Sequence, residues 1–207
     1  MKIVDVTARP FRYQTSTVRD SEGHGHPGPR HEARMVLLTI HSDQGVEGHF
    51  FGAVGAGVLE SVVKPALVGR DPFSRERLWQ ALKERQRLNL AGFADRVLSV
   101  IDLALWDLAG RAVGQTVDRL LGGYRDKVPA YASTMCGDDL EGGLDSPEAY
   151  AAFALFCRER GYPAFKLHTW QPPVPRAPDP RRDIAACAAV REALGPDTPL
   201  MLDPYHY

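Results

Sequence analysis

The sequence predicts an α+β unit built on an antiparallel sheet, followed by the start of a parallel α/β structure. Two observations support this prediction. Residues 33–52 form two strand-like runs joined by a turn, and helical patterns follow them. From residue 128 onward, strand-like and helix-like segments alternate as β-α-β-α-β, the pattern of parallel strands with crossover helices. We therefore expect one domain over residues 1–125 and a second over residues 126–207.

The first unit is expected to begin with a strand, a loop and a hairpin. Residues 2–13 alternate loosely, as in a strand, whereas residues 14–32 are rich in Gly, Pro, Ser and His without periodicity, which predicts a loop. Three helices should follow the hairpin because apolar residues recur there at helical spacing. They span residues 57–69, ended by Pro65 and Gly69, residues 75–86 after a possible N-cap at Ser74, and residues 93–114.

The second unit is expected to contain three strands and two helices. Ser146 as N-cap, Pro147 at the first helical position and Gly161 at the end mark out the first of these helices. The second helix covers residues 179–195, and the strands cover residues 128–136, 164–170 and 199–203.

The composition gives no reason to expect nucleic acid or a membrane as partner. Lys+Arg number 25 against 26 Asp+Glu, so the formal net charge is -1. No apolar run approaches the ~20 residues of a membrane span, and the first residues lack the apolar core of a secretory signal. The three cysteines show no C-x-x-C spacing, which is typical of reduced thiols and predicts a cytoplasmic protein.

Polar side chains end two of the predicted parallel strands, where functional groups gather in such folds. Lys166 and His168 share a face by strand alternation, and Asp203 ends the next strand, two positions before Tyr205. Each residue alone is more often structural: a solvated Lys, a hydrogen-bonded core His, an Asp that starts a turn. Together, the cation would keep His168 neutral and able to accept a proton, while Asp203 suits a hard cation such as Mg²⁺. This combination predicts abstraction of a C–H proton next to a carboxylate.

Three segments carry a resemblance to a known family. They are "VLLTIHSDQGVEGHFFG" at residues 36–52, "LVGRDPFSRERLWQAL" at residues 67–82, and, most specifically, the "ALWDLAG" to "RLLGG" run within residues 97–133. In this order they resemble the mandelate racemase / muconate lactonizing enzyme branch of the enolase superfamily. The resemblance implies an α+β capping domain followed by the first β/α units of a TIM-type (β/α) barrel, truncated after the third strand. Residues 128–207 would supply about 80 of the roughly 250 residues of a full barrel.

The resemblance also implies roles for individual residues. The family's Lys-x-Lys motif, whose second lysine takes the α-proton, becomes Lys166-Leu167-His168 here. His168 is therefore a hypothetical catalytic base, and the alternative is a neutral hydrogen-bond donor with Lys166 acting electrostatically. Asp203 matches the first ligand of Mg²⁺, the expected cofactor, in a site that this chain leaves incomplete. The substrate-binding candidates lie in the loop at residues 14–33, which closes over the barrel in the family, and after the third strand: His24, His26, Arg30, Tyr205 and His206.

The implied activity of the full-length protein is Mg-dependent abstraction of the proton α to a carboxylate, which forms an enediolate. Dehydration of a sugar acid is favoured because the polar candidates around the barrel mouth suit a polyhydroxylated acid. A racemase, epimerase or cycloisomerase of the same superfamily is the alternative. Proteins of another class, namely a non-catalytic truncated fragment, an association module or a sugar-acid-binding protein, also stay open. We expect a small carboxylate substrate, a homo-oligomer when full length, and an inactive 207-residue chain alone.

Overall fold

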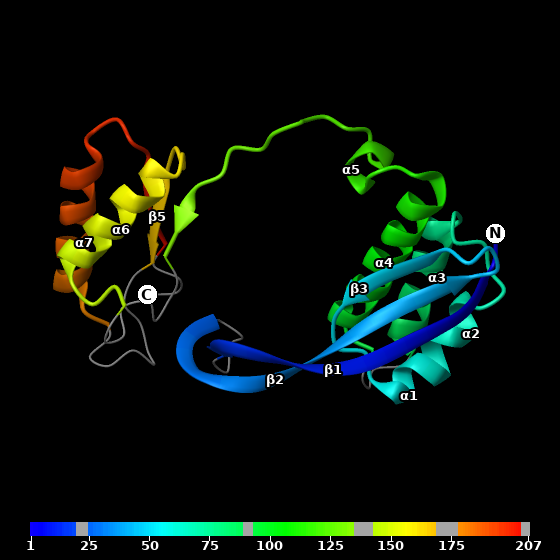
Figure 1. The fold of residues 1–207 in the computed structure, drawn as a ribbon. Coiled ribbons are helices and arrows are strands. Elements are labelled where there is room, and N and C mark those ends of the chain that lie inside the picture. The colour runs from blue at the N-terminus through cyan, green and yellow to red at the C-terminus, as the bar shows by residue number, and fades with distance from the viewer. Residues whose placement is uncertain (20–24, 89–92, 135–142, 169–177, 204–207) are drawn as a thin grey trace. The chain divides into compact units, whose positions relative to one another are not determined.

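The computed structural model describes residues 1–19, 25–88, 93–134, 143–168 and 178–203 (Figure 1). The chain divides into two compact units. The first unit contains Met1–Gln14 and Glu32–Asp126, and the second contains Thr15–His31 and Lys127–Tyr207. Two separate hydrophobic cores are present, one under an antiparallel hairpin sheet and one beside parallel strands. The predicted fold class is confirmed.

Three strands form the first sheet in the order β1-β2-β3. They are β1 (Ile3–Arg19), β2 (Gly25–Ser42) and β3 (Glu47–Phe51), and Figure 1 shows β1 and β2 as a long twisted pair. The predicted loop at residues 14–32 is therefore wrong for its described part, which continues both strands. Pairing of two strands satisfies backbone N–H and C=O groups whatever the side chains are, so the hairpin extends through a sequence of weak strand propensity.

The predicted turn between β2 and β3 is confirmed. The Ser42 hydroxyl donates to the carbonyl of Val46 at 2.7 Å and accepts from the backbone N–H of Val46 at 3.1 Å. Gly45 has a φ of 74°, a left-handed conformation that glycine adopts without steric cost. The register of β3 against β2 then places Gly48 opposite Ile40 and Phe50 opposite Leu38.

Helices follow the sheet in the first unit. We predicted that Pro65 would help to end the first one, but the helical run continues through it to Leu67, and Gly69 follows at a φ of 81°. A π-helical segment that ends at Val63 shifts the hydrogen-bond pattern, and Pro65 then lies in the first turn of α2, where a missing N–H is tolerated. The elements are α1 (Ala56–Val58), the π-helix η1 (Leu59–Val63), α2 (Lys64–Leu67), α3 (Arg75–Leu88), α4 (Asp95–Val113) and α5 (Val117–Leu120).

The long helix α4 packs directly on β3 (Figure 1). Its predicted apolar stripe is buried, with Ile101, Ala104 and Leu108 completely inaccessible to solvent. The approach is so close that a Cβ at Gly48 would lie 2.2 Å from the backbone oxygen of Ala104. Only glycine fits at this position while α4 and β3 keep their separation.

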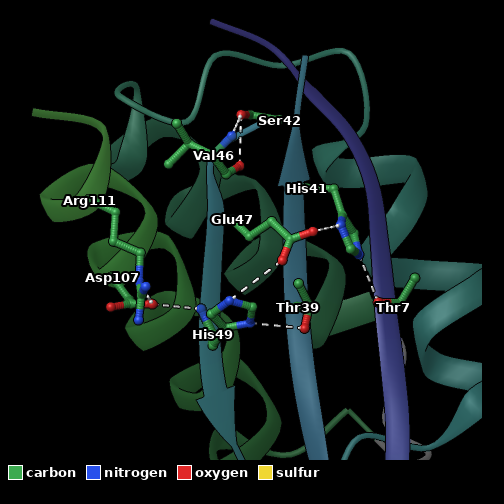
Figure 2. Close-up of polar contacts among 9 residues, drawn as sticks. All are labelled: Thr7, Thr39, His41, Ser42, Val46, Glu47, His49, Asp107 and Arg111. Carbon is green, nitrogen blue, oxygen red and sulfur yellow. Dashed lines mark hydrogen bonds and ion pairs between the residues drawn. The ribbon is translucent and has the colours of Figure 1, made fainter. Parts of the chain in front are cut away.

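Polar contacts join the edge of this sheet to α4 (Figure 2). Oδ2 of Asp107 accepts from the backbone N–H of His49 at 2.8 Å and from Nε of Arg111 at 2.7 Å. On the sheet, Nδ1 of His41 lies 2.8 Å from Oε1 of Glu47, and Nε2 of His49 lies 3.6 Å from Oε2 of the same carboxylate. A single Asp side chain thus fixes the strand and the helix to each other.

The second unit has the predicted β-α-β-α-β order, with three parallel strands in the order β4-β5-β6. Its first helix is capped as the sequence predicts: the Ser146 hydroxyl accepts from the N–H of Ala149 at 3.2 Å, and Gly161 follows the helix at a φ of 88°. The elements are β4 (Ala132–Ser133), α6 (Pro147–Glu159), β5 (Phe165–His168), α7 (Pro180–Leu194) and β6 (Leu200–Asp203).

Candidate active site

The carboxyl ends of β4, β5 and β6 meet at one edge of the parallel sheet. The backbone N–H of Thr134 donates to the carbonyl of Lys166 at 3.0 Å, and His168 pairs in register with Asp203. The three strand ends are therefore neighbours in space although they are far apart in sequence. This is the edge at which parallel α/β folds collect their functional groups.

Alternation along β5 separates a core face from a polar face. Phe165 and Leu167 are each 1% exposed and pack in the core with α6 and α7. Because successive strand side chains point to opposite faces, Lys166 and His168 share the face turned away from that core. The structure places these two residues on one strand face, as the sequence indicates.

Lys166 and Asp203 form an ion pair across two strands. Nζ of Lys166 lies 3.0 Å from Oδ2 of Asp203, with the lysine side chain 19% exposed and the aspartate side chain 37% exposed. The hydrogen bond to Asp203 raises the pKa of Lys166 above its ordinary value, although partial burial opposes this. Lys166 therefore carries a positive charge beside the strand ends at neutral pH.

His168 is held at the end of β5 by a neighbouring strand. Its side chain is largely buried, and its backbone N–H donates to the hydroxyl of Thr134 at 2.9 Å. Thr134 itself is completely buried. A buried hydroxyl that satisfies a buried backbone donor fixes the position of the strand end that carries the imidazole.

Two residues near the site are missed by sequence reasoning. The ring centroid of Tyr131 lies 5.3 Å from Nζ of Lys166, and the tyrosine contributes to the raised pKa of that lysine. The hydroxyl of Thr134 reaches the neighbouring strand. Their position in the predicted strand over residues 128–136 is the only available signal, because both contacts depend on the register between strands.

The remaining predicted site residues either lie in β2 or fall outside the residues that the structure describes. His24, Tyr205 and His206 lie outside the described residues, and His26 lies in β2 but its side chain is not described. Arg30 is an exposed residue of β2. The structure therefore brings together Lys166, His168 and Asp203, while the substrate-binding candidates add no described contact to this group.

The described residues offer part of a metal site. Asp203 places a partly exposed carboxylate at the end of β6, and carboxylate oxygen is the ligand type that Mg²⁺ prefers. Within the described ranges, no group of three or more His, Cys, Asp or Glu side chains could hold a metal ion. Asp203 thus fits a role as one ligand, and further ligands have to come from other residues.

None of the described helices is long and apolar enough to span a membrane.

A hairpin sheet packed on a long helix, followed by β/α units with polar strand ends, is the architecture of a capping domain joined to the start of a (β/α) barrel. Residues 14–122 match the family model for the N-terminal domain of mandelate racemase / muconate lactonizing enzyme, and residues 149–207 match the model for an enolase C-terminal domain-like region. The chain therefore belongs to the mandelate racemase / muconate lactonizing enzyme family of the enolase superfamily.

Curated relatives include sugar-acid dehydratases and cycloisomerases. The chain is 32% identical over 186 residues to an L-talarate/galactarate dehydratase of Salmonella typhimurium, a match that covers 86% of this chain and 44% of the relative. It is 33% identical over 177 residues to a D-galactarolactone cycloisomerase of Agrobacterium fabrum, which covers 83% of this chain and 44% of that protein. The chain thus spans slightly under half the length of these relatives.

Solved structures show the same relationship. A D-glucarate dehydratase from Agrobacterium tumefaciens complexed with magnesium is 54% identical in sequence, with a TM-score of 0.92. The match covers 100% of this chain and 55% of that protein. Magnesium is therefore found in a solved structure that shares this fold and more than half of the aligned residues.

Proposed function

We propose that the protein containing this chain is an acid-sugar dehydratase, which removes the proton α to a carboxylate and then expels the β-hydroxyl. The observation that carries the proposal is the group of Lys166, His168 and Asp203 at the ends of two adjacent parallel strands. Membership of the family and the dehydratase names of several relatives support the same reaction class.

His168 is proposed as the base that accepts the α-proton. It shares a strand face with Lys166, whose positive charge disfavours a second positive charge on the imidazole and so favours the neutral, proton-accepting form. The same charge would stabilise the negative charge that develops on the substrate as the C–H bond breaks. Removal of the α-proton leaves the electron pair in an enediolate, and collapse of the enediolate expels hydroxide from Cβ, which leaves as water once protonated.

Asp203 is proposed as one ligand of Mg²⁺. When bound, the cation would supply Lewis-acid stabilisation of the substrate carboxylate. The partly exposed carboxylate at the end of β6 supports this role. We propose that the site is incomplete in this chain, because one carboxylate is too few for a protein-bound Mg²⁺ and the described residues provide no larger ligand group.

The substrate-binding roles of His24, His26, Arg30, Tyr205 and His206 are proposed by family resemblance. Arg30 is the member of this set with a described environment, and its exposure leaves the guanidinium accessible to a carboxylate, which it can bind through two parallel hydrogen bonds. A substrate with several hydroxyl groups and one or two carboxylates, a sugar acid, suits a site rich in such donors.

The domain boundaries, the cellular location and the oligomeric state are also proposals. The capping domain would cover residues 1–125 and the barrel portion residues 126–207, close to the division of the structure after Asp126. Cys157 and Cys187 are free thiols, which supports work in a reducing cytoplasm. We further propose a homo-oligomeric enzyme, and we expect this chain to be inactive without the residues that complete the metal site.

The proposal is tested by assaying the full-length protein with Mg²⁺ against a panel of aldonic and aldaric acids. A dehydratase produces a 2-keto-3-deoxy acid, which is detected by its reaction with semicarbazide. Formation of that product from at least one sugar acid is the expected result. If no acid of the panel is dehydrated, the proposed function is wrong.

A cycloisomerase is the second candidate, because a D-galactarolactone cycloisomerase is as similar to this chain as the L-talarate/galactarate dehydratase. Its reaction uses proton transfer without net loss of water. The same assay should therefore include sugar-acid lactones. Formation of a keto acid from a lactone, but from none of the open-chain sugar acids, would favour the cycloisomerase over the dehydratase.

A further inference from the structure

A cavity of about 420 Å³ lies between α2 and α3, within the first unit. This volume falls in the range of small-molecule sites, roughly 300–1,000 Å³. The lining comes from α2, the turn after it and one face of α3: Pro65, Ala66, Gly69, Arg70, Asp71, Ser74, Arg77, Leu78, Ala81 and Arg85. Lys166 and Asp203, in contrast, belong to the second unit.

This cavity, called the groove from here on, has buried apolar side chains at its base and arginine side chains at its edge. Ala66 and Leu78 are 5% and 3% exposed and belong to the hydrophobic core below. Arg77 and Arg85 are eight residues apart on α3, so they lie on the same face, about 12 Å apart along the helix axis. Arg70 adds a third guanidinium from the turn that follows α2.

Charge in the groove is unbalanced. Asp71 is the one carboxylate in the lining, and its Oδ1 accepts from the backbone N–H of Phe73 at 3.1 Å. Arg85 is oriented by a hydrogen bond from Nη1 to the carbonyl of Val62 at 3.3 Å. Three guanidinium groups against one carboxylate give the cavity an excess of positive charge.

Two of these arginines lack the ion pairs that some other cations of the first unit form. Arg12, Lys64 and Arg111 all form ion pairs with carboxylates. In the described part of the chain, neither the Arg70 nor the Arg77 side chain makes a hydrogen bond or an ion pair with another residue. Both guanidinium groups are thus available to bind an anion from solution.

We propose that this groove binds a small polyanion, a molecule with at least two carboxylate or phosphate groups on a short skeleton. Guanidinium groups bind both kinds of anion through paired hydrogen bonds. A single anionic group would leave part of this positive charge uncompensated, whereas two or three linked groups can contact arginines whose positions are about 12 Å apart along the helix. The apolar floor suits the skeleton between them.

The first test is calorimetric titration of the full-length protein, without Mg²⁺, with inorganic pyrophosphate and separately with tricarballylate. Binding of either polyanion is the expected result, and the one that binds more tightly identifies phosphate or carboxylate as the preferred group. Acetate should bind at least about tenfold more weakly than the better polyanion. Absence of binding by both polyanions would overturn the proposal.

Variants locate the binding. The double variant Arg70→Gln with Arg77→Gln should lose at least about tenfold in affinity, because each lost guanidinium removes a charge-assisted contact. Arg87→Gln changes a cation of α3 that does not line the cavity, and it should bind as the wild type does. Lys166→Ala should also bind normally. Loss of binding in Lys166→Ala alone would place the anion at the candidate active site and overturn the proposal.

A second measurement does not depend on the variants. Hydrogen exchange of the wild-type protein, with and without pyrophosphate, should show slower exchange confined to amides between Gly69 and Arg85. Binding should also weaken in high salt, since exposed charges are screened within about 10 Å at 0.1 M ionic strength. Protection elsewhere with none in this segment would contradict the proposal. Failure of the dehydratase assay leaves this test unaffected.

Discussion

Nζ of Lys166 lies 3.0 Å from Oδ2 of Asp203, which joins the ends of two neighbouring parallel strands by an ion pair. The pair is diagonal, because Lys166 stands opposite Met201 in the register and Asp203 stands opposite His168. The lysine is thereby drawn toward the strand ends, on the face that also carries the imidazole. Both proposed catalytic groups depend on this arrangement of β5 and β6.

Lys166→Met should lower kcat of the full-length enzyme by about 10²–10⁴-fold, the usual range for loss of a group that assists proton transfer. Methionine keeps most of the side-chain volume but removes the charge. Lys127→Met, at an exposed lysine of the second unit, is the matched control and should leave kcat unchanged. Steady-state kinetics with an accepted sugar acid measure both. Wild-type activity in Lys166→Met would remove the lysine from the proposed mechanism.

Much of this site follows from strand periodicity alone. Phe165 and Leu167 are apolar and Lys166 and His168 are polar, so two faces are visible in four residues. The contact of Thr134 with His168 depends on the register between strands, which local sequence does not encode. The hairpin shows the opposite error: residues 14–19 and 25–32 lack strand periodicity, yet backbone pairing makes them strands. Local sequence patterns predicted the helices and most of the strands, whereas the pairing between strands could be read only from the structure.

Gly48→Ala should destabilise the first unit by at least about 2 kcal/mol. The new methyl group would lie 2.2 Å from the backbone oxygen of Ala104, and relief of this clash requires the backbone of β3 or α4 to move. Gly57 of α1 is the matched control, since a Cβ there would meet no atom within 4 Å. Gly57→Ala should be neutral or stabilising by up to about 1 kcal/mol. Urea unfolding of both variants measures the two effects, and equal stabilities would refute the close packing of β3 on α4.

Asp107→Ala should cost more stability than Arg111→Ala. The first substitution leaves the part-buried N–H of His49 without its acceptor, at a cost of about 1–3 kcal/mol. The second removes only the exposed partner of an i,i+4 ion pair, worth about 0.3–0.5 kcal/mol. The two unfolding free energies can be compared directly in urea. A larger loss in Arg111→Ala would show that Asp107 does not link β3 to α4.

Asp102→Asn should stabilise the protein more at pH 7 than at pH 4. Burial raises the pKa of Asp102 above 3.8, despite the opposing charge of Arg75. The native state therefore holds this proton more tightly than the unfolded state, so the stability that Asp102 contributes is present below pH 3.8 and is lost as the pH rises through the folded pKa. Asparagine removes this loss. Urea unfolding at both pH values tests the sign, and a smaller gain at pH 7 than at pH 4 would contradict it.

In the proposed reaction, the full-length enzyme removes the proton α to the carboxylate of a sugar acid, with His168 as the base. The most direct measurement follows an α-deuterated sugar acid by NMR during turnover by the full-length enzyme with Mg²⁺. We predict release of deuterium to the solvent in step with substrate consumption, and no release by His168→Gln. Consumption of the substrate with deuterium retained at Cα, or undiminished release by His168→Gln, would contradict the proposed role of His168 and the proposed proton abstraction.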